Sequence, residues 1–149
     1  MCTSAQEKEI AIVAHRGYWN CDAAGSAKNS LASLKQAQEL GVWGSEFDVN
    51  MSLDGELLVF HDGSVDGKKI EKHPASDFEY YRLKNGEQIP RLDQYLEQAL
   101  KHPETMLVFE LKKHSCDSVE TKAVEASIAK LKEYGLFNPQ NVMFISFSK

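Results

Sequence analysis

The sequence predicts an α/β fold built on a parallel sheet. Short apolar runs alternate with helical patterns along the whole chain, and most of the connections between them are short. Strands and helices that alternate in this way form parallel sheets with right-handed crossovers, because each helix returns the chain to the edge where the previous strand began. The composition does not change abruptly along the chain, so one domain is expected over residues 10–149.

The first strand and the first helix are expected between residues 10 and 41. Ile10–Ala14 is a short run rich in β-branched residues, which is typical of a strand buried on both faces. Leucine and alanine then recur at helical spacing from Leu31 to Leu40. Ser30 suits the N-cap of this helix, and Gly41 suits its C-terminal end.

The second unit contains a hairpin-like extension and a polar, irregular stretch. Residues 46–51 alternate between polar and apolar side chains, which is the period of a strand. A turn at residues 53–56 leads to a second extended segment, Leu57–Phe60. Residues 63–88 are polar and irregular, and we expect a short helix there that contains Tyr80, Tyr81 and Leu83.

Two further units complete the pattern. We expect a helix from about Leu92 to Leu100, a strand over Met106–Leu111, a long amphipathic helix over about Ser118–Tyr134 and a final strand over Asn141–Phe147. The chain then has four β/α units, of which the last lacks its helix. An open doubly wound sheet and the first half of a (β/α)8 barrel both use four such strands, and the pattern alone favours neither.

Composition and charge exclude several classes of protein. The chain has 149 residues, with 17 Lys and Arg against 22 Asp and Glu. It shows neither the basic stripe of a nucleic-acid-binding protein nor the polybasic block of a membrane-surface anchor. Because no apolar stretch approaches the ~18 residues of a membrane-spanning helix, stable membrane insertion is not expected. The three cysteines are too few for a disulfide scaffold and too scattered for a zinc site.

Residues 1–9 are expected to form an N-terminal tail or the remnant of a signal peptide. Thr3-Ser4-Ala5 resembles the small-residue end of a secretory signal peptide, although the apolar stretch that precedes such an end is missing. We therefore expect a periplasmic or secreted protein. A cytoplasmic protein with a plain polar tail is the alternative.

Charged side chains gather where the apolar strands end. Two side chains that are two residues apart on a strand point to the same face of the sheet, and this applies to Glu46 with Asp48 and to Glu110 with Lys112. In parallel α/β folds the carboxyl ends of the strands are where ligands bind. Such groups need partners or a ligand when they are buried, so we expect a site there. Its members are His15 and Arg16, Glu46 and Asp48, His61 and Asp62, and Glu110 and Lys112.

This set of residues suits metal-assisted attack on a phosphate. Clustered carboxylates repel one another unless a hard divalent cation neutralises them, and Mg²⁺ and Ca²⁺ prefer oxygen ligands. Arg16 and Lys112 can bind an anionic phosphate, and His15 and His61 can serve as general acid and general base. We expect one divalent cation, Mg²⁺ or Ca²⁺, as cofactor. Its predicted ligands are Glu46, Asp48 and Glu110.

The same residues carry a family resemblance. Ordered and well-spaced motifs run from about Ile10 to the last residue, and together they resemble the glycerophosphodiester phosphodiesterase family. These motifs are Ala14-His15-Arg16-Gly17, Asn29-Ser30, Glu46-Phe47-Asp48-Val49, Asp54-Gly55, His61-Asp62, Ile89-Pro90-Arg91-Leu92 and Glu110-Leu111-Lys112.

The resemblance implies a (β/α)8 TIM-type barrel, of which only the first four β/α units are apparent. It also implies an enzyme that hydrolyses a small glycerophosphodiester to an alcohol and glycerol phosphate. In such enzymes the histidines matching His15 and His61 act as acid and base, and the positions matching Arg16 and Lys112 contact phosphate. The three carboxylates hold the metal, and the small insert falls at residues 63–88, after the second strand.

Two departures from the family pattern bear on function. Where the family usually has Glu-Asn-Thr, this chain reads Lys28-Asn29-Ser30, which reverses a charge at the rim of the site. A closed barrel also needs four further β/α units. Three accounts stay open: a piece of a longer chain, self-association of two chains through the exposed edge strand at 141–147, and an open sheet. A fragment that binds metal or phosphate without catalysis is therefore the alternative function.

A third reading concerns a related lipid substrate. A phospholipase D-like relative that cleaves lysolipids or sphingomyelin would need an apolar groove, and residues 63–88 give no clear sign of one.

The burial of four further residues is also predicted. His73, His102 and His114 are expected at the surface, and Trp43 is expected in the core.

Overall fold

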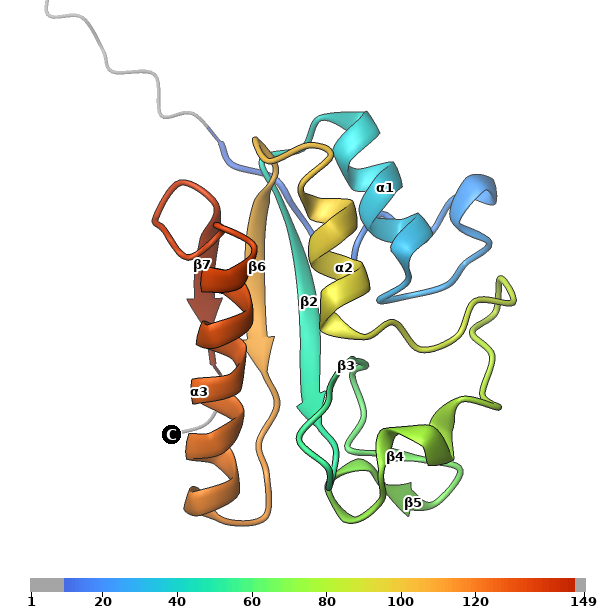
Figure 1. Ribbon diagram of the computed structural model, residues 1–149. Coiled ribbons are helices and arrows are strands. Elements are labelled where there is room, and N and C mark those ends of the chain that lie inside the picture. The colour runs from blue at the N-terminus through green and yellow to red at the C-terminus, as the bar shows by residue number, and fades with distance from the viewer. Residues whose placement is uncertain (1–9, 147–149) are drawn as a thin grey trace, which may run out of the picture.

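The structure is a computed structural model, and it describes residues 10–146. Its main sheet has four parallel strands in the order β1-β2-β6-β7, and β3 pairs antiparallel with the end of β2 (Figure 1). The strands are β1 (Val13–Ala14), β2 (Gly44–Met51), β3 (Leu57–Val59), β4 (Ser64–Val65), β5 (Lys68–Lys69), β6 (Met106–Leu111) and β7 (Val142–Ile145). The helices are α1 (Leu31–Leu40), α2 (Leu92–Ala99) and α3 (Asp117–Glu133), with short 3-10 helices η1 (Asp22–Ala24), η2 (Ile70–Lys72) and η3 (Ala75–Phe78).

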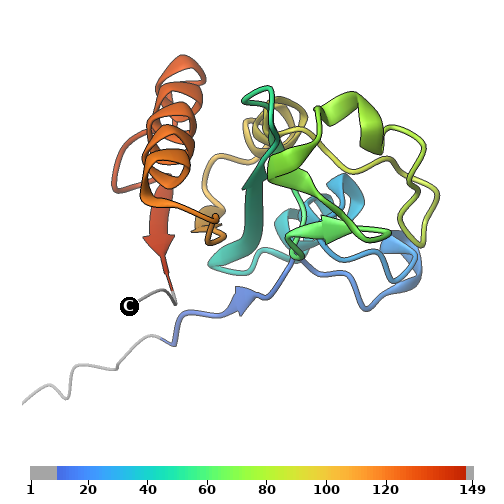
Figure 2. The same ribbon diagram turned by 90° about the horizontal axis from the view of Figure 1, so that it is seen from below.

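The three α-helices cover one face of the main sheet (Figures 1 and 2). Phe47 on β2 and Phe109 on β6 point toward this face, and their ring centroids lie 4.9 Å apart. Both rings belong to one buried core with Leu34 of α1, Leu96 of α2 and Leu131 of α3. Because side chains alternate along a strand, the opposite face carries the three carboxylates that are the predicted metal ligands.

This arrangement decides between the two folds that the sequence left open. A doubly wound sheet reverses its strand order and has helices on both faces. Here the neighbouring parallel strands follow one another in chain order, and the three α-helices of residues 10–146 share one face. This is the arrangement of consecutive units in a (β/α)8 barrel, so the prediction of an α/β barrel segment with an insert after its second strand is confirmed.

The first predicted helix shows why the sequence pattern worked. The Ser30 side chain accepts a hydrogen bond from the Ser33 backbone N–H at 2.9 Å, and the Ser33 side chain accepts one from the Ser30 backbone N–H. These bonds satisfy donors that a helix leaves unpaired at its first turn. Gly41 ends the helix with a φ of 74°, a conformation that glycine adopts without strain.

Two predictions about apolar residues are wrong. The run Ile10–Ala14 is not a strand buried on both faces: β1 has two residues, and the Ile10 side chain is 88% exposed. Among the described residues β1 pairs only with β2, so one side of this run is uncovered. Trp43 is 40% exposed, because it lies between the end of α1 and the start of β2, outside the buried core.

Residues 63–88 form the predicted insert, and it has a small core of its own. Strands β4 and β5 pair as a hairpin, and η2 and η3 follow them. Ile70 and Phe78 pack against Leu58 of β3 in a cluster separate from the main core. The prediction of a short helix containing Tyr80, Tyr81 and Leu83 is wrong: the 3-10 helix η3 ends at Phe78, and Tyr81 and Leu83 lie in irregular chain.

The edge of the sheet at β7 also carries uncovered apolar surface. Within residues 10–146, β7 pairs only with β6, and its Met143 and Phe144 side chains are about half exposed (45% and 48%). Next to them, a cavity of about 420 Å³ is lined mainly by apolar side chains, including Val124 of α3 and Phe137. An uncovered edge of this kind can pair with a further strand.

The ends of the chain bear on two remaining predictions. The expected N-terminal tail or signal-peptide remnant, residues 1–9, lies outside the described residues, and so does Phe147 of the predicted last strand. None of the helices within residues 10–146 has the length and apolar character needed to cross a membrane.

Candidate active site

Three carboxylates meet on the face of the sheet opposite the helices. Glu46 and Asp48 lie two residues apart on β2, and Asp48 pairs in register with Glu110 on β6. Each residue offers one oxygen, and the three oxygens lie within 4.8 Å of one another. All three residues are buried. The pairing of two neighbouring parallel strands therefore forms the cluster, as the sequence predicted.

Glu46 is the member of the cluster whose ionisation is most strongly perturbed. The Arg16 backbone N–H donates a hydrogen bond to its Oε2 at 2.9 Å, and the His15 Nε2 lies 3.7 Å from the same oxygen. Burial, followed by the charge of Asp48, raises the pKa of Glu46 from 4.5 to about 7, although the hydrogen bond from Arg16 acts to lower it. Without a cation, Glu46 is therefore partly protonated at neutral pH.

Asp48 is fully buried and is surrounded by polar groups. The Asn29 side chain donates to its Oδ2 at 3.0 Å and accepts from its backbone N–H at 3.3 Å. The Arg16 Nε lies 3.8 Å from Oδ2, and the Lys112 Nζ lies 3.7 Å from Oδ1. Lys112 also donates to Glu110 Oε1 at 3.1 Å. The two predicted phosphate-binding cations thus flank the carboxylates.

The arrangement of donors fits a hard divalent cation. Oε1 of Glu46 and Oδ1 of Asp48 are buried without a hydrogen bond. A buried acceptor that lacks a hydrogen bond is energetically unfavourable, and Mg²⁺ and Ca²⁺ both prefer carboxylate oxygens. The Arg16 Nε is also buried without a hydrogen bond, and it lies 3.8 Å from Asp48 Oδ2, so the guanidinium charge is held against the cluster.

The loop after β1 has a backbone conformation that few sequences allow. Arg16 and Gly17 have φ values of 59° and 77°, both in the left-handed region. A Cβ at position 17 would lie 2.7 Å from the Ser33 Cβ and 2.8 Å from the Ser33 carbonyl carbon, so only glycine permits this close approach to α1. The turn places the Arg16 backbone N–H against Glu46 and the Arg16 side chain against Asp48.

The two predicted acid–base histidines occupy different positions. His15 is beside Glu46, with its side chain 71% exposed. His61 follows β3, and its Nδ1 lies 2.7 Å from Asp62 Oδ1, a contact that orients the ring. His61, Asp62 and Arg16 line one cavity of about 260 Å³. The structure therefore brings His61 to the same cavity as a predicted phosphate-binding residue.

Asn50 was not predicted to contribute to the site. Its side-chain amide donates to the Phe60 carbonyl at 2.7 Å and to the Asp62 carbonyl at 3.0 Å. These two bonds tie the loop that carries His61 to β2. The period of the strand already placed Asn50 on the face of Glu46 and Asp48, but its partners depend on the antiparallel return of β3.

Two residues at the rim of the site, His114 and Lys28, have surroundings that the sequence did not predict. The prediction that His114 is a surface residue is wrong: it is buried, and its Nε2 accepts a hydrogen bond from the Met51 backbone N–H at 3.0 Å. The loop after β6 folds back over the end of β2, and this packing buries the ring. Lys28, which departs from the family pattern that the sequence resembles, has its Nζ 4.6 Å from the centre of the Trp19 ring.

Comparisons with known proteins identify the family of this chain. The profile of the glycerophosphoryl diester phosphodiesterase family matches residues 15–149. A glycerophosphodiester phosphodiesterase of Caldanaerobacter subterraneus subsp. tengcongensis is 34% identical over 98 residues, which cover 58% of this chain and 39% of that protein. Glycerophosphodiester phosphodiesterase 1 of Homo sapiens is 30% identical over 128 residues, which cover 74% of this chain and 36% of that protein.

Solved structures share the fold. The crystal structure of a glycerophosphodiester phosphodiesterase from Parabacteroides distasonis has a TM-score of 0.85 and 40% identity, over 91% of this chain and 56% of that one. An Oleispira antarctica phosphodiesterase in complex with the product sn-glycerol-3-phosphate has a TM-score of 0.74 and 28% identity, over 93% of this chain and 58% of that one.

The chain thus spans just over half of these solved chains and about two-fifths of the curated relatives. The match begins at the first predicted site residue, and it contains both strand ends that form the carboxylate cluster. This chain therefore belongs to the glycerophosphoryl diester phosphodiesterase family.

Proposed function

We propose that this protein hydrolyses glycerophosphodiesters to an alcohol and glycerol phosphate, with one divalent cation, Mg²⁺ or Ca²⁺, as cofactor. The observation that carries the proposal is the buried cluster of three carboxylates flanked by Arg16 and Lys112. The family supports the reaction class, and the product complex of the Oleispira antarctica relative supports glycerol phosphate as a product. A bound cation supplies charge that stabilises the phosphoryl oxygens in the transition state.

The residues around the cluster have distinct parts in this proposal. Arg16 and Lys112 bind the phosphate oxygens, and their fixed charges hold the phosphorus near the carboxylates. His15 and His61 exchange protons with the reacting oxygens. One removes the proton from the attacking hydroxyl, which belongs to water or to the glycerol group, and the other protonates the departing alcohol as the P–O bond breaks. If the glycerol hydroxyl attacks, the product is a cyclic phosphate, and water then opens the ring to give glycerol phosphate. The contact with Asp62 keeps His61 oriented for this exchange.

The proposal includes closure of the sheet by further strands. β1 and β7 each pair on one side within residues 10–146, and apolar side chains of β7 are exposed beside it. The relatives are longer than the matched region. We propose that further strands, from additional chain or from a second copy, cover these edges in the active protein and fix the site residues in place.

The direct test is release of sn-glycerol-3-phosphate from glycerophosphoethanolamine and glycerophosphocholine, with Mg²⁺, with Ca²⁺ and with a chelator. The account predicts metal-dependent release that Asp48→Asn abolishes. Glu125→Gln, an exposed change on α3, serves as the matched control and retains activity. Release that survives both the chelator and Asp48→Asn would contradict the proposed function.

The open sheet favours one second candidate, a domain that binds metal or phosphate without turning over substrate. The residues proposed to contact the cation and the phosphate are present, but displacement of these residues by ~1 Å removes most of a catalytic rate. This candidate predicts cation binding that Asp48→Asn abolishes, together with no release of glycerol phosphate. The same set of measurements therefore separates the two candidates.

A further inference from the structure

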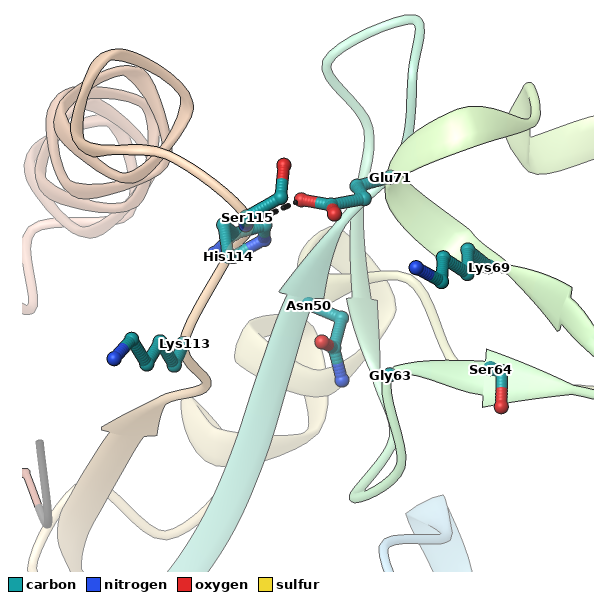
Figure 3. Close-up of a pocket in the computed structure, with 8 residues that line it drawn as sticks. All are labelled: Asn50, Gly63, Ser64, Lys69, Glu71, Lys113, His114 and Ser115. Carbon is teal, nitrogen blue, oxygen red and sulfur yellow. Dashed lines mark hydrogen bonds between the residues drawn. The ribbon is translucent and has the colours of Figure 1, made fainter.

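The loop at residues 61–63, which carries His61, borders open space. His61 and Asp62 line a cavity of about 260 Å³, and Gly63 lines a second cavity, of about 460 Å³, that Asn50 also lines (Figure 3). A Cβ at position 63 would meet no atom within 4 Å outside the neighbouring residues. Because open space replaces packed side chains here, the position of the loop depends on its hydrogen bonds.

Backbone hydrogen bonds hold the ends of this loop but not its centre. The Phe60 N–H donates to the Asp48 carbonyl at 3.0 Å, and the Gly63 carbonyl accepts a bond from the insert at 2.9 Å. Among the residues that the structure describes, no backbone–backbone hydrogen bond involves His61 or Asp62. The Asp62 side chain bonds to the neighbouring His61 ring, so this contact does not join the loop to the sheet. A connection between His61 and the sheet therefore requires a side chain.

Asn50 supplies this connection. Its side-chain amide donates to the Phe60 carbonyl at 2.7 Å and to the Asp62 carbonyl at 3.0 Å, one on each side of His61. A carbonyl oxygen only accepts hydrogen bonds, so both contacts use the NH₂ group and the orientation of the amide is fixed. Asn50 is buried, and Figure 3 shows its side chain extending from β2 toward Gly63. The amide is a firm support, because its displacement would leave buried donors without partners.

The place of Asn50 on β2 relates His61 to the carboxylate cluster. Asn50 lies two residues after Asp48 on the same face of the strand, which is about 7 Å farther along it. One strand therefore carries Glu46, Asp48 and the amide that holds the His61 loop. We propose that Asn50 is a positioning residue, which keeps His61 within reach of a phosphate bound at the carboxylates. This rests on the proposed function, because that function gives His61 its part in proton transfer.

The first expected effect is a loss of kcat without a loss of binding. Asn50→Leu removes both donors and nearly preserves the shape of the side chain. Since displacement by ~1 Å of a group that transfers a proton is costly, this substitution is expected to lower kcat about tenfold to 10²-fold. Neither hydrogen bond of Asn50 goes to Arg16, Lys112 or a carboxylate, so KM and cation affinity are expected to stay within about twofold.

A double-mutant cycle with His61→Ala separates positioning from general structural damage. If Asn50 acts through His61, then Asn50→Leu lowers kcat in the unaltered protein and has no further effect in His61→Ala. A loss of kcat by the same factor in both backgrounds would overturn the inference. Asn50→Ala, which adds no bulk at this buried position, is measured alongside and is expected to give the same result.

Asn141 offers a matched control. Its side-chain amide also joins a strand to a loop, because it donates to the Pro103 carbonyl at 2.9 Å. It directly precedes β7, and so it lies at the end of the sheet opposite the carboxylate cluster. Asn141→Leu is expected to leave kcat unchanged in both backgrounds. A loss of kcat equal to that of Asn50→Leu would show that any such bond affects the rate, and would overturn the inference.

The order of the loop is measured without turnover, by NMR relaxation of the isotope-labelled protein. The amides of residues 61–63 are expected to fall from order parameters of about 0.85 to below about 0.6 in Asn50→Leu, and to be unaffected in Asn141→Leu. Unchanged order in Asn50→Leu overturns the inference. Absence of turnover by the unaltered protein refutes the proposed function, and the relaxation data then decide whether Asn50 holds His61. Turnover that Asn50→Leu leaves unchanged refutes the role of Asn50 and leaves the function.

Discussion

Replacement of Glu46 by glutamine tests how burial and cation binding are linked in the carboxylate cluster. Glutamine keeps an oxygen that can accept the hydrogen bond from the Arg16 backbone N–H, and it has the shape of a protonated glutamic acid. In the metal-free protein, the substitution therefore removes the titration of Glu46 with little change in packing. It also removes one of the three predicted ligands of the cation.

The size of the effect follows from the raised pKa. Burial and the charge of Asp48 raise the pKa of Glu46 from 4.5 to about 7 in the folded protein. Between these values the folded state holds a proton that the unfolded state has lost, so the free energy of unfolding falls as pH rises. At about 1.4 kcal/mol for each pKa unit, the loss by pH 8 is on the order of 3 kcal/mol. Below about pH 4.5 this contribution is fully present.

The assay is urea unfolding at about pH 5 and about pH 8, with chelator and with excess Mg²⁺. With chelator, Glu46→Gln is expected to match the unaltered protein at the lower pH and to exceed its free energy of unfolding at the higher pH by about 3 kcal/mol. Mg²⁺ is expected to stabilise only the unaltered protein, and more at the higher pH, because the cation competes with the proton on Glu46.

The control for this experiment is Glu125→Gln, which changes the same residue type at an exposed position of α3. It is expected to leave both the pH dependence and the response to Mg²⁺ unchanged. The reasoning is refuted if Glu46→Gln destabilises the metal-free protein at the higher pH, since that would show that the ionised carboxylate stabilises the fold.

Three further predictions concern the loops and the sheet edge. His61→Ala is expected to lower kcat about 10²-fold or more with cation affinity unchanged, measured by product release and calorimetry; an unchanged kcat would exclude His61 from proton transfer. In thermal unfolding, Gly67→Ala is expected to destabilise the protein by about 1 kcal/mol and Gly17→Ala by clearly more. Both glycines have a φ near 78°, but only a Cβ at position 17 would contact Ser33. Equal losses would show that crowding against α1 is unimportant. Light scattering is expected to show self-association that Phe144→Lys reduces, since this exposed edge side chain is apolar; a stable monomer at high concentration would contradict this.

Local periodicity predicted the α/β class, the parallel sheet and the carboxylate cluster, whereas the barrel followed only from the family resemblance. Alternation along residues 46–51 fixes which side chains share a face, and the Ser30 cap fixes where α1 begins. The carboxyl ends of parallel strands then gather the charged residues with no further information. Glu46, Asp48 and Glu110 meet for this reason.

Other features depend on contacts between distant segments, which periodicity does not encode. The apolar run at Ile10 resembles a buried strand, but its exposure depends on whether a strand lies on its other side. His114 has the sequence context of a loop, yet its burial follows from a hydrogen bond to Met51, 63 residues away. The role of Asn50 likewise depends on the return of β3. The burial and the contacts of such residues can be predicted only when the pairing of the strands is known.

The measurement that tests the central claim most directly is a calorimetric titration of the metal-free protein with Mg²⁺ and with Ca²⁺ at about pH 8. The account predicts one cation for each chain, release of a proton on binding at lower pH, and loss of binding in Asp48→Asn but not in Glu125→Gln. Absence of cation binding, or binding that Asp48→Asn leaves intact, would contradict the assignment of Glu46, Asp48 and Glu110 as a metal centre.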